Sequence, residues 1–348
     1  MLKMLLLQNL SITLLLVLAG IAAIAAFRIG RDQFILWKKP LDKMPDTRHL
    51  VLPDQRRIAY GIYGALNATP TVFYFHGTPS SHHEAFLLSE AGRRHGVRIV
   101  APSRPGSGGS TLHENSVLLD YPDDILALAE FLQISSFGII AVSGGAPYAF
   151  ACRYRIPRPR LRGMGIVAGI YPVASLGTVG MKLPSRLMLR VATWFPGVVA
   201  WLIDKQLGSV ARDEDGNKLE ALLVADMEHH AKPQSERLAW ETATPEIRRA
   251  VVTSVREGVK YGGWGAAWEM KVLGSHWGFE LNQIQPSVQG DLVMWHGNLD
   301  GNVPLGMAQK AATQLGPLAE LRVVEGQGHV TLTFHSAGEI IKTIRNML

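Results

Sequence analysis

Cysteine and charged residues are scarce in this sequence of 348 residues, and each shortage excludes a class of protein. Cys152 is the single cysteine, so the chain can form neither an internal disulfide nor a cysteine-rich zinc site, and a reducing compartment is favoured. This thiol lies in a predicted helix, where a buried packing residue is expected rather than a nucleophile. Charged residues make up only 18% of the chain and hydrophobic residues 47%, which argues against extensive disorder.

The basic charge of the chain comes without a nucleic-acid-binding pattern. The formal net charge is +6, but the sequence has no long Lys/Arg block and no recognisable nucleic-acid motif. The densest basic run, at 153–162, is typical of a solvated helix end, with contact to anionic lipid as the alternative. No nucleic-acid partner is therefore expected.

An uncharged run long enough for a membrane anchor opens the sequence. The 24 residues Met4–Phe27 carry no charge, and about 20 apolar residues are enough to span the hydrocarbon core of a bilayer. Residues 1–27 are therefore predicted to be a single-pass anchor, and residues 28–48 a juxtamembrane linker. A signal peptide cleaved near Ala23–Ala25, which would give a secreted protein, is the alternative. More basic residues follow the run than precede it, which places the next domain on the cytoplasmic side.

Beyond the linker, short apolar runs alternate with helical patterns. Strands are predicted in a hairpin at 50–64 that turns near Asp54-Gln55, and at 71–75, 97–101, 137–142, 161–168, 291–295 and 320–324. Helical patterns lie between them, including 304–315 and a final amphipathic stretch to residue 348. This alternation predicts an α/β fold with a mostly parallel central sheet and helices on both faces.

Residues 174–285 interrupt the alternation. They show helical patterns, several tryptophans and no clear strand. We therefore predict a core made of residues 49–173 and 286–348, with residues 174–285 as a mainly helical insertion.

Ser143 stands at the junction between the strand at 137–142 and the next helix. Its neighbours two positions away, Ala141 and Gly145, are small enough to relieve the crowding of a tight strand-to-helix turn. Such a turn raises the serine Oγ above the sheet and directs the amide of Gly144 at a developing oxyanion. An ordinary glycine-rich turn is the alternative interpretation of these residues taken alone.

Asp300 and His329 each follow a predicted strand. Both therefore belong at the carboxyl ends of the strands, where functional groups of α/β proteins gather. A serine hydroxyl becomes a nucleophile when a histidine takes its proton and a carboxylate orients that histidine. The chain order Ser143, Asp300, His329 is the order expected for a nucleophile on such a turn. No Asp or Glu occurs between Glu130 and Asp204, so the strand at 161–168 offers no competing carboxylate. Together the three residues predict a catalytic triad.

With these residues the sequence resembles the α/β-hydrolase superfamily over nearly all of residues 45–348. The matching segments are His76–Pro79, Ser103–Gly106, the Ser143 turn, Trp295–Pro304 and Gly328-His329. The resemblance implies that a backbone amide of Gly77 or Thr78 is the second oxyanion donor, opposite Gly144. It also implies that the helical insertion is a cap over the site.

The sequence departs from the family pattern at several positions. Ser103 stands where the family usually has Asp, and Gln55 stands where Gly is common in the hairpin. The serine at position 143 argues against the epoxide hydrolase and dehalogenase branches, which use an aspartate there.

The expected activity is that of a serine hydrolase acting on a carboxylic ester, thioester or amide through an acyl-enzyme. This chemistry needs no metal and no organic cofactor. An apolar cap and an anchor favour a small-molecule substrate with a hydrophobic acyl group. A C–C hydrolase, a lyase or an acyltransferase using the same triad is one alternative, and a non-catalytic binding protein of the same fold is the other.

Overall fold

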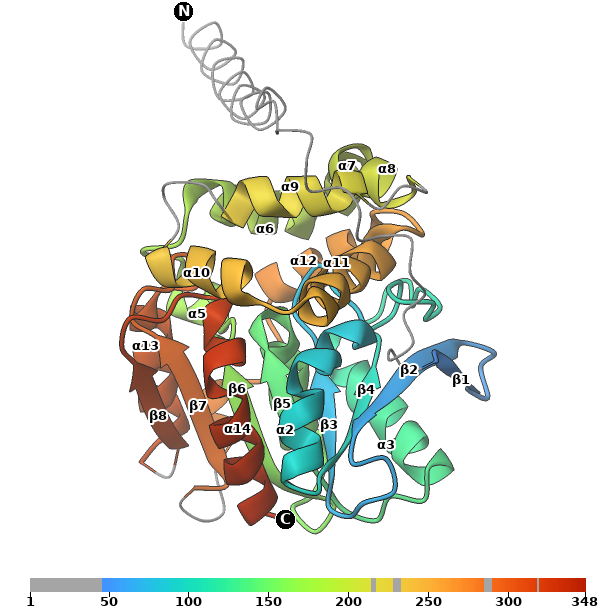
Figure 1. The fold of residues 1–348 in the computed structure, drawn as a ribbon, viewed down its shortest axis with the longest axis vertical. Coiled ribbons are helices and arrows are strands. Elements are labelled where there is room, and N and C mark those ends of the chain that lie inside the picture. The colour runs from blue at the N-terminus through green and yellow to red at the C-terminus, as the bar shows by residue number, and fades with distance from the viewer. Residues whose placement is uncertain (1–45, 214–216, 228–232, 285–289, 318) are drawn as a thin grey trace, which may run out of the picture.

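The computed structural model describes residues 46–213, 217–227, 233–284, 290–317 and 319–348 (Figure 1). Its strands are β1 (Arg48–Val51), β2 (Arg57–Gly64), β3 (Thr71–Phe75), β4 (Arg98–Pro102), β5 (Phe137–Val142), β6 (Leu161–Val167), β7 (Leu292–Gly297) and β8 (Ala319–Val324). They form one sheet in the order β1-β2-β4-β3-β5-β6-β7-β8. The pairs β1-β2 and β2-β4 are antiparallel and the other pairs are parallel. The predicted hairpin is confirmed, and so is the mostly parallel sheet.

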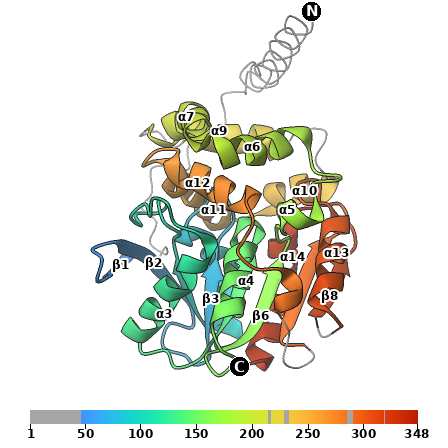
Figure 2. The same cartoon turned by 180° about the vertical axis from the view of Figure 1, so that it is seen from behind.

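Helices cover both faces of this sheet. They are α2 (Ser89–Arg94), α3 (Tyr121–Phe131), α4 (Ala146–Arg155), α13 (Leu305–Leu315) and α14 (Thr331–Asn346), with the 3₁₀ helices η2 (His82–Leu88), η3 (Leu118–Asp120), η4 (Ser143–Gly145) and η6 (Leu281–Gln283). Helices α2 and α14 lie on one face and α3, α4 and α13 on the other (Figures 1 and 2). Alternate side chains of β3 divide between two apolar cores, with Phe73 and Phe75 in one and Val72 and Tyr74 in the other. This burial on both sides explains why Val72–Phe75 of β3 is a continuous run of apolar and aromatic residues.

The described chain between β6 and β7 is helical, and we call residues 173–274 the helical region. Its elements are α5 (Val173–Leu176), α6 (Leu183–Trp194), α7 (Pro196–Ile203), the π-helical turn η5 (Asp204–Gly208), α8 (Ser209–Ala211), α9 (Asn217–Met227), α10 (Gln234–Thr242), α11 (Pro245–Val259) and α12 (Trp264–Gly274). The helical region lies over the carboxyl ends of the parallel strands (Figure 1). It encloses an apolar core of its own, which includes Ala200, Trp240 and Val252.

The helical region and the sheet domain are in direct contact at two glycines, Gly265 and Gly106, with no side chain between their backbones. A Cβ built on Gly265 of α12 would lie 2.4 Å from the carbonyl oxygen of Gly106, so a side chain there would force the layers apart. Gly106 itself has φ of 82°, a conformation that glycine adopts without strain. Nearby, the amide of Gly108 donates to the carbonyl oxygen of Glu257 at 2.8 Å. The two layers are therefore in close contact at the turn that follows β4.

The predicted anchor, residues 1–27, lies outside the described residues, as does most of the predicted linker. Among the helices that the structure does describe, none is both long enough and apolar enough to cross a bilayer.

Candidate active site

Ser143 occupies a strained turn at the carboxyl end of β5. Its φ is 50°, in the left-handed region that non-glycine residues rarely adopt. The turn passes directly into η4 and α4. Gly145 must be glycine, because a Cβ there would lie 2.4 Å from the carbonyl oxygen of Phe75 in the neighbouring strand. The predicted strand-to-helix turn is present. It places the serine at the carboxyl end of the sheet, beneath the helical region.

Ser143, His329 and Asp300 are joined by hydrogen bonds in a single line. The Nε2 atom of His329 lies 2.9 Å from the Oγ of Ser143, and its Nδ1 lies 2.7 Å from an oxygen of Asp300. The three residues follow β5, β8 and β7, which are different strands of the sheet. The side chains of Asp300 and His329 are both largely shielded from solvent. The structure thus brings the three sequence-predicted residues into contact.

Asp300 is held as a carboxylate. Its Oδ1 accepts the backbone amides of Asn302 and Val303, each at 2.9 Å. Burial acts to raise the pKa of Asp300, but His329, the nearby His296 and the amide of Val303 outweigh it and hold the pKa below its ordinary value. An ionised carboxylate only accepts hydrogen bonds, so the Nδ1 of His329 donates to it. In the neutral imidazole the lone pair then lies on Nε2, facing the serine hydroxyl.

The loops that carry Asp300 and His329 are bonded to each other. The amide of Leu299 donates to the carbonyl oxygen of Gln327 at 3.0 Å, and the amide of Gly326 donates to the side chain of Asn298 at 2.8 Å. The amide of Val330, next to His329, donates to the buried carboxylate of Glu236 in α10 at 3.2 Å. The position of the histidine is therefore set by both the sheet domain and the helical region.

The loop after β3 lies against the serine turn on its other side. A Cβ built on Gly144 would lie 2.3 Å from the Oγ1 of Thr78 and 3.5 Å from its amide nitrogen. The amide of Gly77 donates to the two carboxylate oxygens of Glu84, at 3.0 and 3.2 Å. Of the two oxyanion donors that the sequence left open, Gly77 is thus already engaged. Thr78 is the one whose amide lies beside Gly144.

Glu84 of η2 forms several hydrogen bonds with this loop and with β3. Its carboxylate accepts the hydroxyl of Tyr74 at 2.7 Å as well as the hydroxyl of Ser80. Together with the Gly77 amide, these contacts fix the loop between β3 and η2.

A buried ion pair connects the same loop to the helical region. The Nε of Arg104, which follows β4, donates to Glu269 of α12 at 2.6 Å, and neither side chain is appreciably exposed. A second carboxylate oxygen of Glu269 accepts the hydroxyl of Thr78 at 2.6 Å. Arg104 also donates to the carbonyl oxygens of His76 and Gly77. Burial acts to lower the pKa of Arg104, but Glu269 outweighs it, so the pKa lies above its ordinary value.

Ser103, which stands where the family usually has Asp, forms hydrogen bonds that hold the turn after β4. Its Oγ accepts the amide of His82 at 3.0 Å and lies 2.7 Å from the ring Nδ1 of the same residue. Its carbonyl oxygen accepts the hydroxyl of Ser110 at 2.8 Å. A serine therefore joins the turn after β4 to the start of η2.

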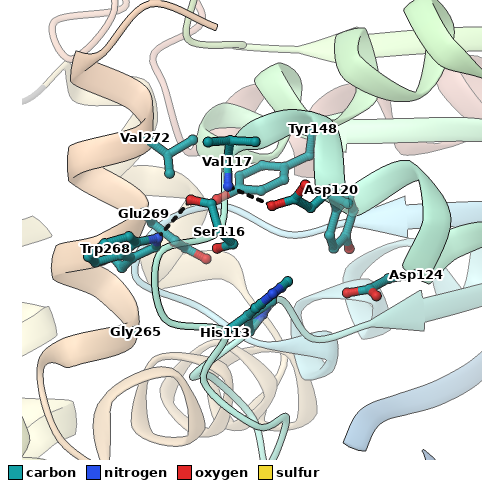
Figure 3. Close-up of a pocket in the computed structure, with 12 residues that line it drawn as sticks. His113, Ser116, Val117, Asp120, Asp124, Tyr148, Gly265, Trp268, Glu269 and Val272 are labelled. Carbon is teal, nitrogen blue, oxygen red and sulfur yellow. Dashed lines mark hydrogen bonds between the residues drawn. The ribbon is translucent and has the colours of Figure 1, made fainter. Parts of the chain in front are cut away.

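A small cavity lies behind the ion pair, between α12 and the loop that precedes η3 (Figure 3). Tyr148 and Glu269 line it, and the indole of Trp268 donates to the carbonyl oxygen of Ser116 at 3.1 Å across its wall. Its volume of about 20 Å³ is close to the space that one water needs. The cavity is therefore too small to hold more than about one water.

Glu84, Glu236 and Glu269 are the site residues that sequence reasoning missed. Each is an ordinary glutamate of a helical segment by its local sequence. Their partners lie on other elements, so no spacing pattern could have marked them. In the described part of the chain, no group of three or more His, Cys, Asp and Glu side chains could hold a metal ion.

Comparison with known proteins identifies the fold. Residues 72–342 match the sequence profile described as the Alpha/beta hydrolase family. Similar solved structures include an esterase from Exiguobacterium antarcticum (14% identity, 86% of this chain and 97% of that one, TM-score 0.58). A second is an esterase from Thermogutta terrifontis, with 16% identity over 86% of this chain and 97% of that one and a TM-score of 0.52. A third is an enol-lactonase from Burkholderia xenovorans, with 14% identity over 86% of this chain and 99% of that one and a TM-score of 0.56. No curated protein sequence matches the chain.

Proposed function

The chain belongs to the alpha/beta hydrolase family, and on that basis we propose that it is a serine hydrolase that cleaves a carboxylic ester through an acyl-enzyme. The observation that carries the proposal is the unbroken hydrogen-bonded line from Ser143 through His329 to the ionised Asp300. The strained φ of Ser143 supports it further, because such strain is retained where function requires it.

In the first half of the proposed reaction, the Oγ of Ser143 attacks the carbonyl carbon while its proton passes to Nε2 of His329. Asp300 stabilises the imidazolium that forms. The amides of Gly144 and Thr78 hold the oxyanion, and each such donor contributes about 10²–10³ in rate. The proton on Nε2 then passes to the alcohol oxygen as the C–O bond breaks, which leaves the acyl group on Ser143.

In the second half, water attacks the acyl-enzyme. His329 takes a proton from this water, the tetrahedral intermediate forms in the same oxyanion hole, and Nε2 returns the proton to Oγ as the C–O bond to the serine breaks. Thioesters and amides would react by the same sequence. We propose that the helical region is the cap that closes over this chemistry, and that a hydrophobic acyl group lies beneath it.

We further propose that residues 4–27 anchor the protein in a membrane with the hydrolase domain on the cytoplasmic side. The support is the uncharged run together with Arg28, Arg31, Lys38 and Lys39 immediately after it. Extraction of the full chain from membranes at alkaline pH and mass spectrometry of its N-terminal peptide test this. Release into the soluble fraction, or loss of the N-terminal peptide, would contradict it.

The proposed chemistry is tested with a fluorophosphonate, which phosphonylates an activated serine and releases fluoride. We expect the full chain to be labelled and the Ser143→Ala variant to remain unlabelled. Asp120→Asn is a matched control, because the new side-chain carbonyl can still accept the amide of Val117 that Asp120 accepts at 2.8 Å. Labelling of Ser143→Ala as strong as that of the parent would overturn the assignment of the nucleophile.

A further inference from the structure

Large apolar side chains on α6, on α7 and at the start of α12 face solvent. Trp194, at the end of α6, is 76% exposed and Trp201, on α7, is 59% exposed. Phe195, Val198 and Trp264 are exposed as well. We call these five residues the aromatic patch. Single exposed apolar residues are common, whereas a group of this kind marks an interaction surface.

Close packing of the helices joins the patch into one surface. A Cβ built on Gly197 of α7 would lie 3.4 Å from the ring of Trp264 on α12. A Cβ built on Gly263 would lie 2.1 Å from the carbonyl oxygen of Ala200, so the two helices meet with no side chain between their backbones. The ring of Trp264 on α12 is therefore held against α7 beside Gly197.

Positive charge accompanies the aromatic patch. Arg186 and Arg190 are exposed and recur at the spacing that places them on the same face of α6 as Trp194. Lys205, exposed beyond α7, has the same relation to Trp201. The sequence has no acidic residue between Glu130 and Asp204, and Asp204 is bonded to Arg212 at 2.7 Å. The outer face of α6 and α7 thus combines aromatic rings with cations.

We propose that the aromatic patch and its flanking cations dock the helical region onto the headgroup layer of an anionic lipid bilayer. Tryptophan favours this layer because its apolar ring is buried while its N–H reaches water. Arginine and lysine pair with anionic headgroups and add electrostatic attraction to the apolar contact. The combination of an aromatic face with basic side chains is typical of surfaces that lie in the membrane interface.

The position of the patch suits this role. Helices α6, α7 and α9 form the layer of the helical region farthest from the sheet (Figures 1 and 2). The predicted linker between the anchor and β1 could extend up to roughly 70 Å, so the proposed anchor leaves the patch free to reach the bilayer. The inference deepens the proposed membrane location and rests on it. It does not depend on the activity of Ser143.

A nitroxide probe in the full chain tests the docking. Cys152 is fully buried and burial raises the pKa of its thiol, so a cysteine introduced at the surface takes the label alone. Val198→Cys places the probe in the aromatic patch. Leu66→Cys is the matched control, because Leu66 is 56% exposed against 51% for Val198. Leu66 follows β2, whose last residue, Gly64, pairs with Arg98 at the amino end of β4, away from the helical region. Both proteins are reconstituted into vesicles of phosphatidylcholine with or without phosphatidylglycerol.

On the anionic vesicles we expect the probe at 198 to become several-fold more accessible to oxygen than to a water-soluble nickel chelate. The probe at 66 should remain in water. We call the ratio of oxygen accessibility to nickel accessibility at position 198 the contrast. High salt, or vesicles of phosphatidylcholine alone, should lower this contrast. A probe at 198 that remains as accessible to nickel as the probe at 66 would overturn the proposal.

The other occupants of the patch have their own signatures. Spin–spin broadening at 198 would mean that a second copy covers the patch. Shielding from both reagents in detergent, without vesicles, would mean that another segment of the chain covers it. Either result overturns the lipid proposal. Failure of the chain to insert into vesicles would overturn the anchor and the docking together, whereas hydrolysis of a soluble ester, measured on the same sample, would still report the triad.

A variant in which only the charges change separates the rings from the cations. The double variant Arg186→Gln/Arg190→Gln alters exposed side chains and should leave hydrolysis of a soluble short-chain ester unchanged. We expect it to reduce the contrast at position 198 on anionic vesicles by at least half. If the contrast is undiminished, Arg186 and Arg190 do not contribute to docking.

Discussion

The two sides of Ser143 are built in different ways. In the proposed mechanism, the side that transfers protons consists of His329 and Asp300, which come from the loops after the adjacent strands β8 and β7. The side proposed to face the oxyanion consists of Thr78, which is held by Arg104 of the sheet domain and Glu269 of the helical region. The chemical groups are therefore supplied by the sheet, whereas the placement of one oxyanion donor depends on the helices above it. Mutations can separate the two contributions.

The largest effect is expected on the proton-transfer side. Asp300→Asn should lower kcat by about 10⁴, because an amide no longer holds the proton on Nδ1 of His329 and no longer stabilises the imidazolium. The steady-state rate on a soluble ester measures this, with Asp120→Asn as the control. If the variant keeps more than a tenth of the parent kcat, Asp300 is not the orienting carboxylate.

A smaller effect is expected on the oxyanion side. Glu269→Gln leaves the guanidinium of Arg104 buried without a counter-ion, which should lower the free energy of unfolding by about 3 kcal/mol. Because the loop of Thr78 then loses its support, kcat should fall by about 10–100 with a lesser change in KM. Urea unfolding and steady-state kinetics measure the two quantities.

The control for this variant is Glu257→Gln on α11. Glu257 forms a partly exposed pair with Lys260 at 2.6 Å, and losing it should cost at most about 1 kcal/mol. If Glu269→Gln loses stability but keeps the parent kcat, the ion pair is structural and does not position Thr78.

Acid should also weaken the oxyanion side first. His76, His82 and His83 are buried around its loop, and burial lowers the pKa of each, to about 4 for His83. Between pH 6.5 and 4 the unfolded chain binds protons that the folded chain does not, so the free energy of unfolding falls as the pH falls. His83 alone accounts for up to about 3 kcal/mol of this loss.

Asp300 has an effect of the same sign, in a lower pH range. Its pKa lies below the ordinary value of 3.8, so its contribution to stability is lost only at more acidic pH. Urea unfolding at several pH values between about 7 and 4 measures the loss, and His83→Gln should flatten the profile. A profile of His83→Gln as steep as that of the parent would show that His83 is protonated in the folded state.

The smallest effect is expected away from the reacting atoms. Ser103→Ala removes the acceptor of the buried amide of His82 and should lower the free energy of unfolding by about 1–2 kcal/mol. The value of kcat should remain within about twofold, because neither Thr78 nor Arg104 loses a contact. The exposed Ser209→Ala should change neither quantity. A large loss of kcat in Ser103→Ala would extend the oxyanion side to this turn.

The same comparison explains how far the sequence could predict the molecule. The strands and the placement of Ser143, Asp300 and His329 follow local rules, since an apolar run predicts a strand and the next loop lies at its carboxyl end. The pairing of Glu269 with Arg104 has no local pattern, because 165 residues separate the two. The choice between Gly77 and Thr78 depends on the direction of a backbone amide, which residue type does not encode. The anchor remains a prediction about residues 1–27.

The contact between Gly106 and Gly265 gives the molecule a minimum gap between its two layers. Side chains of increasing size at position 265 would therefore act as spacers of increasing thickness between the layers. Gly265 lies one helical turn before Glu269 on α12. Each spacer would move the two layers apart and, in the same movement, draw Glu269 away from Arg104. If the helical region is the proposed cap, the room beneath it and the support of Thr78 would then change together, in graded steps, from one position on α12.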